Sequence, residues 1–448
     1  YSTCQADLPA SQAYTIEDFR IKHNEVYRDR FDENFWAAAR ASTSLYVTLD
    51  DHEVTNDFAG GASPSTDPLF FDQSVTYINE TVLFRTGVQV FHEYNPIREE
   101  FYGDTGDPRT ANKSKLYRYR TFGSDAAIFL LDARSFRDQE LTNVVNPFDN
   151  PAIRQFVEDS FDPNRTMLGQ AQFNDLTEDL LDAQTRGITW KFIMVPEPIQ
   201  NLTPVQAADR YEGYAFERTQ LIQFIVENGI TNVVFIAADI HGTFINNVTY
   251  QLNPDDHQRT TGTFEITTGS VAYAAPFGPT VLQYLPFGGL ISGLYGSLAS
   301  GRQDRLFLWT ANWLLHWFGY SPVGLQKTSI DADLNEGSYL AVNSYGWNEF
   351  EIDAQSQRLT VPDVRMSEST TKMLGDVRDA INSRMRVFLE YQDAGHDTTE
   401  RIVWPLTPTS SPASTTSQSW TWMVVWPRWS LTLPCRTRRR HDRAAAAR

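Results

Sequence analysis

Cysteine is almost absent from this chain. Its 448 residues include only Cys4 and Cys435, which lie at opposite ends of the sequence. Two such thiols cannot build a disulfide framework, and neither has the Cys/His spacing of a zinc site. Long apolar runs are also missing, because the best candidate, Leu306–Tyr320, is short and contains polar residues. The sequence therefore predicts no transmembrane helix.

Positive charge is scarce as well. Lys and Arg number 38 against 56 Asp and Glu, a formal net charge of −18. A nucleic-acid partner is thereby disfavoured, since a phosphate backbone is bound by a surplus of Lys and Arg. Acidic balance is compatible with cation binding and with an extracellular enzyme. Hydrophobic residues at 41% and aromatic residues at 13% are enough for a substantial globular core.

The chain begins with Tyr1 and shows no signal peptide, so we expect its natural start to lie upstream. Five Asn-x-Ser/Thr sequons favour a secreted or cell-surface protein of a eukaryote. They lie at Asn79, Asn112, Asn164, Asn201 and Asn247.

Composition changes abruptly near residue 405. Seven arginines and one aspartate give residues 405–448 a net charge of +6, so that residues 1–404 carry −24. The segment is rich in Ser, Thr and Pro, and then in Trp and Arg. It is either a basic tail that binds an anionic surface or a segment on which no particular fold has been selected in evolution. We favour the second interpretation and expect one domain over 1–404, followed by an irregular, disordered tail.

Short apolar segments alternate with helical patterns in the first half of the chain. The continuous apolar character of the former is typical of strands covered on both faces. Such strands are expected at 44–50, 126–132, 189–195 and 232–238, with helices at 174–184 and 216–228. Strands separated by helices predict a layered α/β fold.

Further along, short strands are expected at 262–268, 338–343, 347–352 and 358–361, as in an antiparallel sheet edge, with a helix over 372–391. The aromatic segment 306–318 is either a mobile lid or a buried core helix. We favour the core helix, because aromatic residues at helical spacing are usually packing residues.

Charged residues follow three of the predicted strands. Asp50-Asp51-His52-Glu53, with Asn56 behind it, offers oxygen ligands and an imidazole within seven residues. The run is equally compatible with an acidic helix start. Because ligand crevices of α/β sheets lie beyond the carboxyl ends of strands, the position favours a site.

Asp239-Ile240-His241-Gly242 follows the strand predicted at 232–238. Alternate residues after a strand project to the same side, so Asp239 and His241 could face one metal. A hydrogen-bonded turn would explain the pair equally well. Two separate acidic and His clusters at strand ends favour a metal site over coincidence.

Asp132-Ala-Arg134-Ser-Phe-Arg137 places two guanidinium groups at the same edge. One could orient a ligand carboxylate and the other could hold a phosphate oxygen, although a structural Asp–Arg pair explains Arg137 at least as well. Lys191 begins a strand and is expected to be structural, whereas Trp190 could wall the pocket.

Together these residues resemble the PhoD-like alkaline phosphatase D family of metallophosphoesterases. The resemblance covers about residues 15–362, and four blocks that carry it occur in the family's order. They are YVTLDDHEVTNDF (46–58), YRTFGSDAAIFLLDARSFRDQ (119–139), TMLGQAQFNDLTEDLLDAQTRGITWKFIMVPEP (166–198) and YAFERTQLIQFIVENGITNVVFIAADIHGTF (214–244).

The resemblance implies a four-layer α/β/β/α sandwich that hydrolyses phosphate mono- or diesters with a metal-activated water. It implies metal ligands at Asp50, Asp51, Asn56, Asp239 and His241, with iron and calcium as the metals. The family's earlier Gly-Asp-x-x-Tyr motif is not found in residues 1–45. We expect that motif just upstream of Tyr1, so that the chain carries part of the metal site.

The implied mechanism assigns two catalytic residues. His52 would protonate the departing alkoxide, and Arg134 would stabilise charge on the phosphate. The main alternative is a truncated or pseudoenzyme form with an incomplete metal site and no activity. A third, less supported alternative is a surface-binding module that uses the aromatic segment and the tail.

Overall fold

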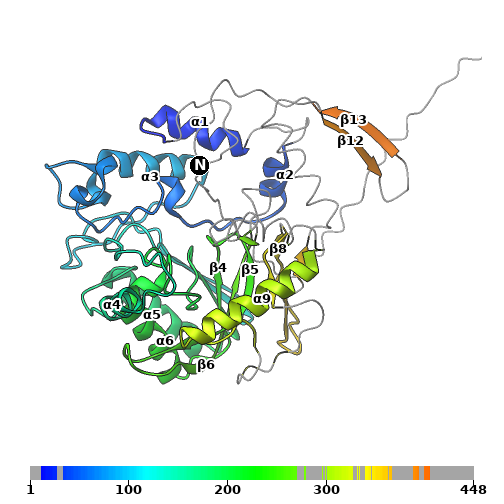
Figure 1. Ribbon diagram of the computed structural model, residues 1–448. Coiled ribbons are helices and arrows are strands. Elements are labelled where there is room, and N and C mark those ends of the chain that lie inside the picture. Colours follow the sequence, from blue (N-terminus) through cyan, green and yellow to red (C-terminus); the bar gives the residue numbers. More distant parts are fainter. Residues whose placement is uncertain are drawn as a thin grey trace, which may run out of the picture.

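The computed structural model describes residues 12–27, 34–269, 300–325, 339–344 and 346–361, three short strands at 363–365, 387–392 and 398–403, and a few single residues near these ranges (Figure 1). The expected boundary between residues 404 and 405 and the tail beyond it lie outside the described residues.

A seven-stranded mixed sheet forms the centre of the molecule, in the order β1-β2-β3-β4-β6-β5-β7. Strands β2, β3, β4 and β6 are parallel to one another, whereas β1, β5 and β7 are antiparallel to their neighbours. The carboxyl ends of the four parallel strands therefore meet at one edge of the sheet. The strands are β1 Arg118–Phe122, β2 Ala126–Leu130, β3 Trp190–Met194, β4 Val233–Ala237, β5 Thr243–Tyr250, β6 Arg259–Thr267 and β7 Leu340–Ala341.

Three of the four strands expected in the first half are confirmed as β2, β3 and β4. Every residue of β2 and β4 is buried, as their continuous apolar character predicted. In the parallel register, Phe129 pairs with Ile193, and Ile193 pairs with Phe235. These three side chains consequently share one face of the sheet.

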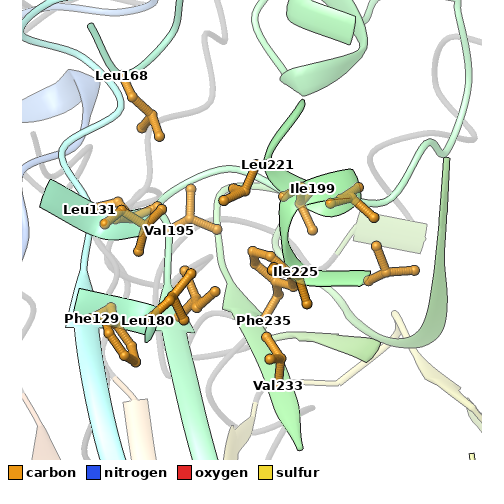
Figure 2. Close-up of a cluster of buried hydrophobic side chains, with 14 of the residues drawn as sticks. Phe129, Leu131, Leu168, Leu180, Val195, Ile199, Leu221, Ile225, Val233 and Phe235 are labelled. Carbon is orange, nitrogen blue, oxygen red and sulfur yellow. The ribbon is translucent and has the colours of Figure 1, made fainter. Parts of the chain in front are cut away.

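Helices α5 (Gln170–Thr185) and α6 (Ala215–Glu227) cover that face and confirm the two helices predicted there. In Figure 2, Leu180 from α5 and Leu221 and Ile225 from α6 point into the layer between the helices and the sheet. Each of these side chains is at most 2% exposed, and full burial of one contributes about 2 kcal/mol.

Short antiparallel strands cover the opposite face, in agreement with the antiparallel edge expected there. Phe350 packs against Phe192 and lies in one cluster with Ile128 and Ile236. Trp190 belongs to this face and starts β3, at the strand end opposite the carboxyl edge, so it does not wall a pocket there. The strands are β8 Gly346–Asn348, β9 Glu351–Ile352, β10 Leu359–Thr360 and β11 Asp363–Arg365.

The residues before β1 include α1 (Ile16–Tyr27), α2 (Phe35–Ser42) and α3 (Val82–Tyr94), and they form a second hydrophobic cluster to which α1 and α3 contribute. Helices α1 and α3 lie side by side (Figure 1). The Arg20 guanidinium of α1 contacts the Glu93 carboxylate of α3 at 2.7 Å.

The strand predicted at 44–50 is not formed, apart from one bridging residue at Tyr46. A strand requires a hydrogen-bonded neighbour, and Thr48 instead reaches the end of β2 through its hydroxyl, which donates to the Leu131 carbonyl.

The aromatic segment forms helix α9 (Ser300–Trp317), but the expectation of a fully buried core helix is wrong. Leu315 packs against Ile240 and Phe244, whereas the three tryptophans of the helix face outward. Their exposed fractions are 69% for Trp309, 52% for Trp313 and 57% for Trp317. Helical spacing alone could not show that one face of the helix is exposed.

The helix predicted over 372–391 is wrong at its end, because Val387–Gln392 is strand β12 and pairs with β13 (Thr398–Val403). Both segments are rich in β-branched or aromatic residues, which favour a strand when a partner is present. Residues 366–386 lie outside the described part of the chain.

Glu265 on β6 should make the stability of the fold depend on pH. Its carboxylate is fully buried and accepts hydrogen bonds from the backbone N–H groups of Ile199 and Gln200. Burial raises the pKa of Glu265 to about 7, despite those bonds. The folded protein thus binds this proton more tightly than the unfolded chain does. The resulting stability is present below pH 4.5 and is lost as the pH rises to 7.

Between pH 4.5 and 7, the free energy of unfolding of the wild type should therefore fall by roughly 3 kcal/mol relative to Glu265→Gln. Urea denaturation of both proteins across this range measures the difference. The exposed residue Glu178 on α5 supplies the control variant Glu178→Gln, which should run parallel to the wild type. If the free energy of unfolding changed with pH in the same way for Glu265→Gln and the wild type, the raised pKa of Glu265 would be contradicted.

Candidate functional site

Polar residues gather where the parallel strands end. Asp132 and Arg134 follow β2, Glu197 follows β3, and Asp239 and His241 follow β4. Because these strands are parallel neighbours, the residues that follow them meet at one edge of the sheet.

The Asp50–Glu53 run reaches this edge from the N-terminal segment as a short 3-10 turn. The Glu53 carboxylate accepts the backbone N–H of Asp50 at 2.9 Å. The Asp51 carboxylate accepts the N–H groups of His52 at 2.7 Å and Asp57 at 2.9 Å. The helix-start alternative is thus partly realised. Yet Asp50 to Glu53 are each at most 5% exposed, which is unusual for a solvated helix start.

The backbone around Asp239 and His241 differs from the extended geometry expected from the sequence. Strand β4 ends at Ala237, and the N–H of Ile240 donates to the Ala238 carbonyl at 2.7 Å. Asp239 and His241 both have left-handed backbones, with φ of 60° and 53°. Each such residue costs about 1–2 kcal/mol, and strain of this kind is typical of functional sites.

Electrostatics show that the two predicted clusters lie near one another. Burial, together with the carboxylates of Asp50 and Asp209, raises the pKa of Asp239 to about 8. Burial lowers the pKa of His241, while the charges of Asp51 and Asp50 oppose this shift. Asp239 and His241 therefore lie within the electric field of Asp50 and Asp51, as expected for one shared site.

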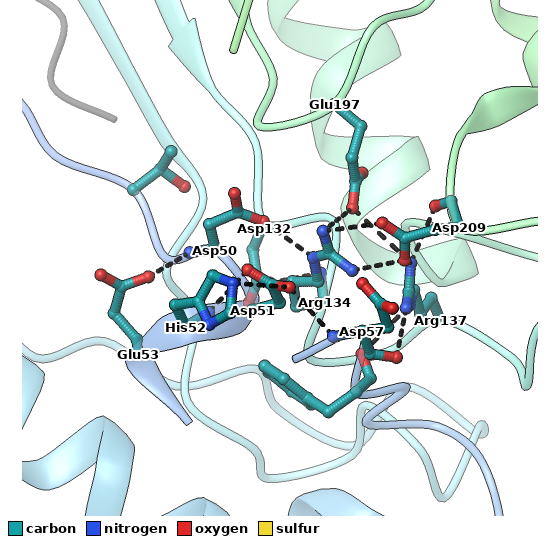
Figure 3. Close-up of polar contacts among 12 residues, drawn as sticks. Asp50, Asp51, His52, Glu53, Asp57, Asp132, Arg134, Arg137, Glu197 and Asp209 are labelled. Carbon is teal, nitrogen blue, oxygen red and sulfur yellow. Dashed lines mark hydrogen bonds and ion pairs between the residues drawn. The ribbon is translucent and has the colours of Figure 1, made fainter. Parts of the chain in front are cut away.

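Arg134 lies between several of these carboxylates (Figure 3). Its Nε is 2.8 Å from Asp50 Oδ1, its Nη2 is 2.6 Å from Glu197 Oε1, and its Nη1 is 2.7 Å from Asp209 Oδ1. None of the side chain is exposed. All three guanidinium nitrogens are engaged, which does not suit direct contact with a substrate.

Arg137 is equally buried, in agreement with its expected structural role. Its Nη1 lies 2.5 Å from Asp209 Oδ1, and its Nη2 lies 3.0 Å from Glu140 Oε1. Lys191 also has the structural role expected of it, since its Nζ donates to the Thr231 carbonyl.

Sequence reasoning missed Glu197 and Asp209. Glu197 follows the end of β3, so the rule that selected Asp239 would also have selected it. Asp209 lies in the long loop between β3 and α6, where no local pattern marks it. Burial opposes ionisation of Asp209, but the Arg134 and Arg137 guanidiniums outweigh it and hold its pKa well below the usual range.

One group of carboxylates is already spaced as metal ligands are. Oxygen atoms of Asp57, Glu140 and Asp209 lie within 4.8 Å of one another. Among the described residues, no three of the predicted ligands meet that spacing. The negative charges of the predicted carboxylates repel one another, so a cation is needed to draw them together.

One further observation indicates that the predicted site suits a cation. Asp50 Oδ2 is buried and has no hydrogen-bond partner in the described part of the chain. Such an atom is costly to bury unless something satisfies it, and a cation would do so. Asn56 lies nearby on the exposed side, where its amide donates to Asp57.

Buried carboxylates and a histidine at the carboxyl edge of a mixed α/β sheet are an arrangement typical of cation-dependent hydrolases. The chain belongs to the PhoD-like phosphatase family, whose sequence model matches residues 2–285. The resemblance noted from the sequence is thereby confirmed, and the chain is a member of a family of metal-dependent phosphatases.

A characterised relative is alkaline phosphatase D of Bacillus subtilis (strain 168), 28% identical over 251 residues. The match covers 53% of this chain and 37% of that protein, so the chain spans little more than a third of its relative. A solved structure described as "Structure of PhoD" is 24% identical, covering 58% of this chain and 46% of that one, with a TM-score of 0.44. This structural likeness adds nothing to the family assignment.

Proposed function

We propose that this chain forms the catalytic centre of a phosphoesterase that hydrolyses phosphate mono- or diesters by a metal-activated water. One observation carries the proposal. The charges of Asp50 and Asp51 in the N-terminal segment raise the pKa values of Asp239 and His241, which follow β4 about 190 residues further along the chain. Family membership supports the same reaction class.

Asp50, Asp51, Asn56, Asp239 and His241 would hold the cations. Carboxylate, amide and imidazole ligands suit both iron and calcium, the two metals that we propose. Bound there, the cations would supply Lewis acidity to a phosphoryl oxygen and lower the pKa of a water molecule.

His52 is the residue proposed to give a proton to the departing alkoxide. Its Nε2 lies 3.7 Å from Asp51 Oδ2, and the Asp51 carboxylate also accepts the backbone N–H of His52. Asp51 would thereby hold the imidazole in place beside the site. The proposed contact of Arg134 with the phosphate does not suit its burial, and another role for Arg134 is argued below.

Metal removal and reloading test the proposal. The purified chain should contain iron and calcium and hydrolyse nitrophenyl phosphate or bis-nitrophenyl phosphate. Chelation should reduce turnover by roughly 100-fold or more, equivalent to about 3 kcal/mol, and the metals should restore it. Mass spectrometry measures the metals, and the ratio of the two rates separates monoesterase from diesterase activity. Substoichiometric metal with no turnover would instead support the inactive, truncated alternative.

The four-layer sandwich and the single domain over 1–404 are part of the same proposal. The described residues supply a helical layer, the central sheet and a partial layer of short strands on the other face. A fuller second sheet would complete the arrangement that the resemblance implies.

A secreted or cell-surface location is also proposed. No helix among the described residues is both long and apolar enough to cross a membrane. Of the five sequons, Asn79, Asn201 and Asn247 are at most 5% exposed, and Asn79 donates to two backbone carbonyls. Asn112 and Asn164 are exposed, which leaves two positions open to a glycan.

A further inference from the structure

The contact between Arg134 and Asp50 orients a proposed metal ligand. Arg134 Nε binds Oδ1 of Asp50, whereas Oδ2 is buried without a hydrogen-bond partner among the described residues. One carboxylate oxygen is thus anchored and the other is left for a cation. Outer hydrogen-bond partners of this kind orient metal ligands and tune metal affinity.

Arg134 is itself held rigidly. Glu197 and Asp209 occupy its two terminal nitrogens, and Arg137 binds the same Asp209 carboxylate from the other side. We call these four residues, Arg134, Arg137, Glu197 and Asp209, the arginine brace. Its members follow the ends of β2 and β3 and occupy the loop before α6, so three parts of the fold fix its position (Figure 3).

The brace also fastens the loop that carries the other N-terminal ligands. Arg137 Nη2 donates to the Asp57 carbonyl, and its Nε donates to the Phe58 carbonyl at 3.1 Å. The N–H groups of Gly60 and Gly61 donate to the carbonyls of Arg134 and Arg137, each at 2.9 Å. Residues 50–61 are thereby tied to residues 134–137 at both ends.

We propose that Arg134 is a positioning residue whose role is to hold Asp50 for cation binding, and that it makes no contact with the phosphate ester. The proposal rests on the proposed function, because it assumes that Asp50 is a metal ligand. It predicts that loss of Arg134 weakens metal binding while leaving the affinity for substrate unchanged in the metal-loaded protein.

The test compares Arg134→Met and Arg134→Lys with the wild type. Iron and calcium affinities are measured by chelator competition without substrate, and KM and kcat for bis-nitrophenyl phosphate are measured at saturating metal. Arg134→Met should bind metal roughly 10–100-fold more weakly, with KM within about twofold of the wild type. Lysine keeps the charge but cannot bridge three carboxylates, so rescue should be partial. Unchanged metal affinity with a tenfold higher KM would overturn the proposal in favour of phosphate contact.

Loss of the guanidinium leaves buried carboxylates without a partner and could unfold the protein. The double variant Arg134→Met/Glu197→Gln removes one of those charges and should fold, yet still bind metal weakly.

Arg109→Met is the matched control, because Arg109 also joins two carboxylates, those of Asp107 and Asp138. The Arg109→Met variant should bind metal normally. Normal metal affinity in a folded double variant would refute the proposal. Absence of metal binding in the wild type would refute the proposed function instead.

Discussion

Asp239→Asn should reduce phosphodiester hydrolysis by roughly 1,000-fold or more, equivalent to about 4 kcal/mol, and should lower the amount of bound metal. Asparagine has the shape of aspartate but lacks its charge. The charge is what a cation requires from a carboxylate that lies in the field of Asp50 and Asp209. Turnover of bis-nitrophenyl phosphate and metal content per chain measure the two effects.

The backbone conformation at position 239 accepts this substitution without added strain. Asp239 has a φ of 60°, and asparagine is among the few residues other than glycine that adopt such a backbone readily. The variant should therefore fold as the wild type does, with less repulsion among the site carboxylates. Asp255→Asn is the control, since the Asp255 side chain is 81% exposed. Wild-type turnover in Asp239→Asn would remove Asp239 from the proposed ligand set.

Gly60→Ala should destabilise the protein by roughly 3 kcal/mol or more and weaken metal binding at the same time. A Cβ at Gly60 would lie 2.2 Å from the carbonyl oxygen of Ser135 and 2.6 Å from its carbonyl carbon. Both atoms belong to the backbone, so no side chain can rotate away. The two segments must separate, which would break the hydrogen bond from Gly60 to the Arg134 carbonyl.

Gly262→Ala is the matched control for this prediction. A Cβ at Gly262 on β6 meets no atom within 4 Å, so the substitution should be neutral or stabilise slightly. Thermal unfolding and chelator competition measure the two proteins side by side. Equal stability of the two variants would show that residues 50–61 and 134–137 are not closely packed in solution.

The parallel strands could be predicted because a strand that is buried on both faces has a continuous run of apolar residues in the sequence. The apolar runs that became β2, β3 and β4 need no knowledge of their partners to be recognised. Residues 44–50 have a similar pattern, yet a strand forms only when a neighbour is in reach. Exposure of a helix face likewise depends on which parts of the chain pack against it. The sequence of α9 therefore did not indicate that Trp309, Trp313 and Trp317 would face outward.

Part of the candidate site was predictable, although only Asp239 and His241 follow a strand that the structure forms. Asp50, Asp51, Asp239 and His241 were selected by position and composition, and the charges of the first two raise the pKa values of the last two. Asp209 was not predictable, because it reaches Arg134 from a long loop whose path depends on tertiary packing. The role of Arg134 was only partly predictable, since the sequence did not show which of the two arginines orients a ligand carboxylate and which could hold a phosphate oxygen.

The left-handed backbones of Asp239 and His241 bear on how this protein could evolve. Glycine would relieve the strain at both positions and stabilise the fold by about 1 kcal/mol at each. In a lineage that had lost the need for hydrolysis, no selection would oppose that exchange. Descendants without the activity should therefore acquire Gly-x-Gly after β4, and this motif in their sequences would indicate that hydrolysis has been lost. This chain has aspartate and histidine at these two positions.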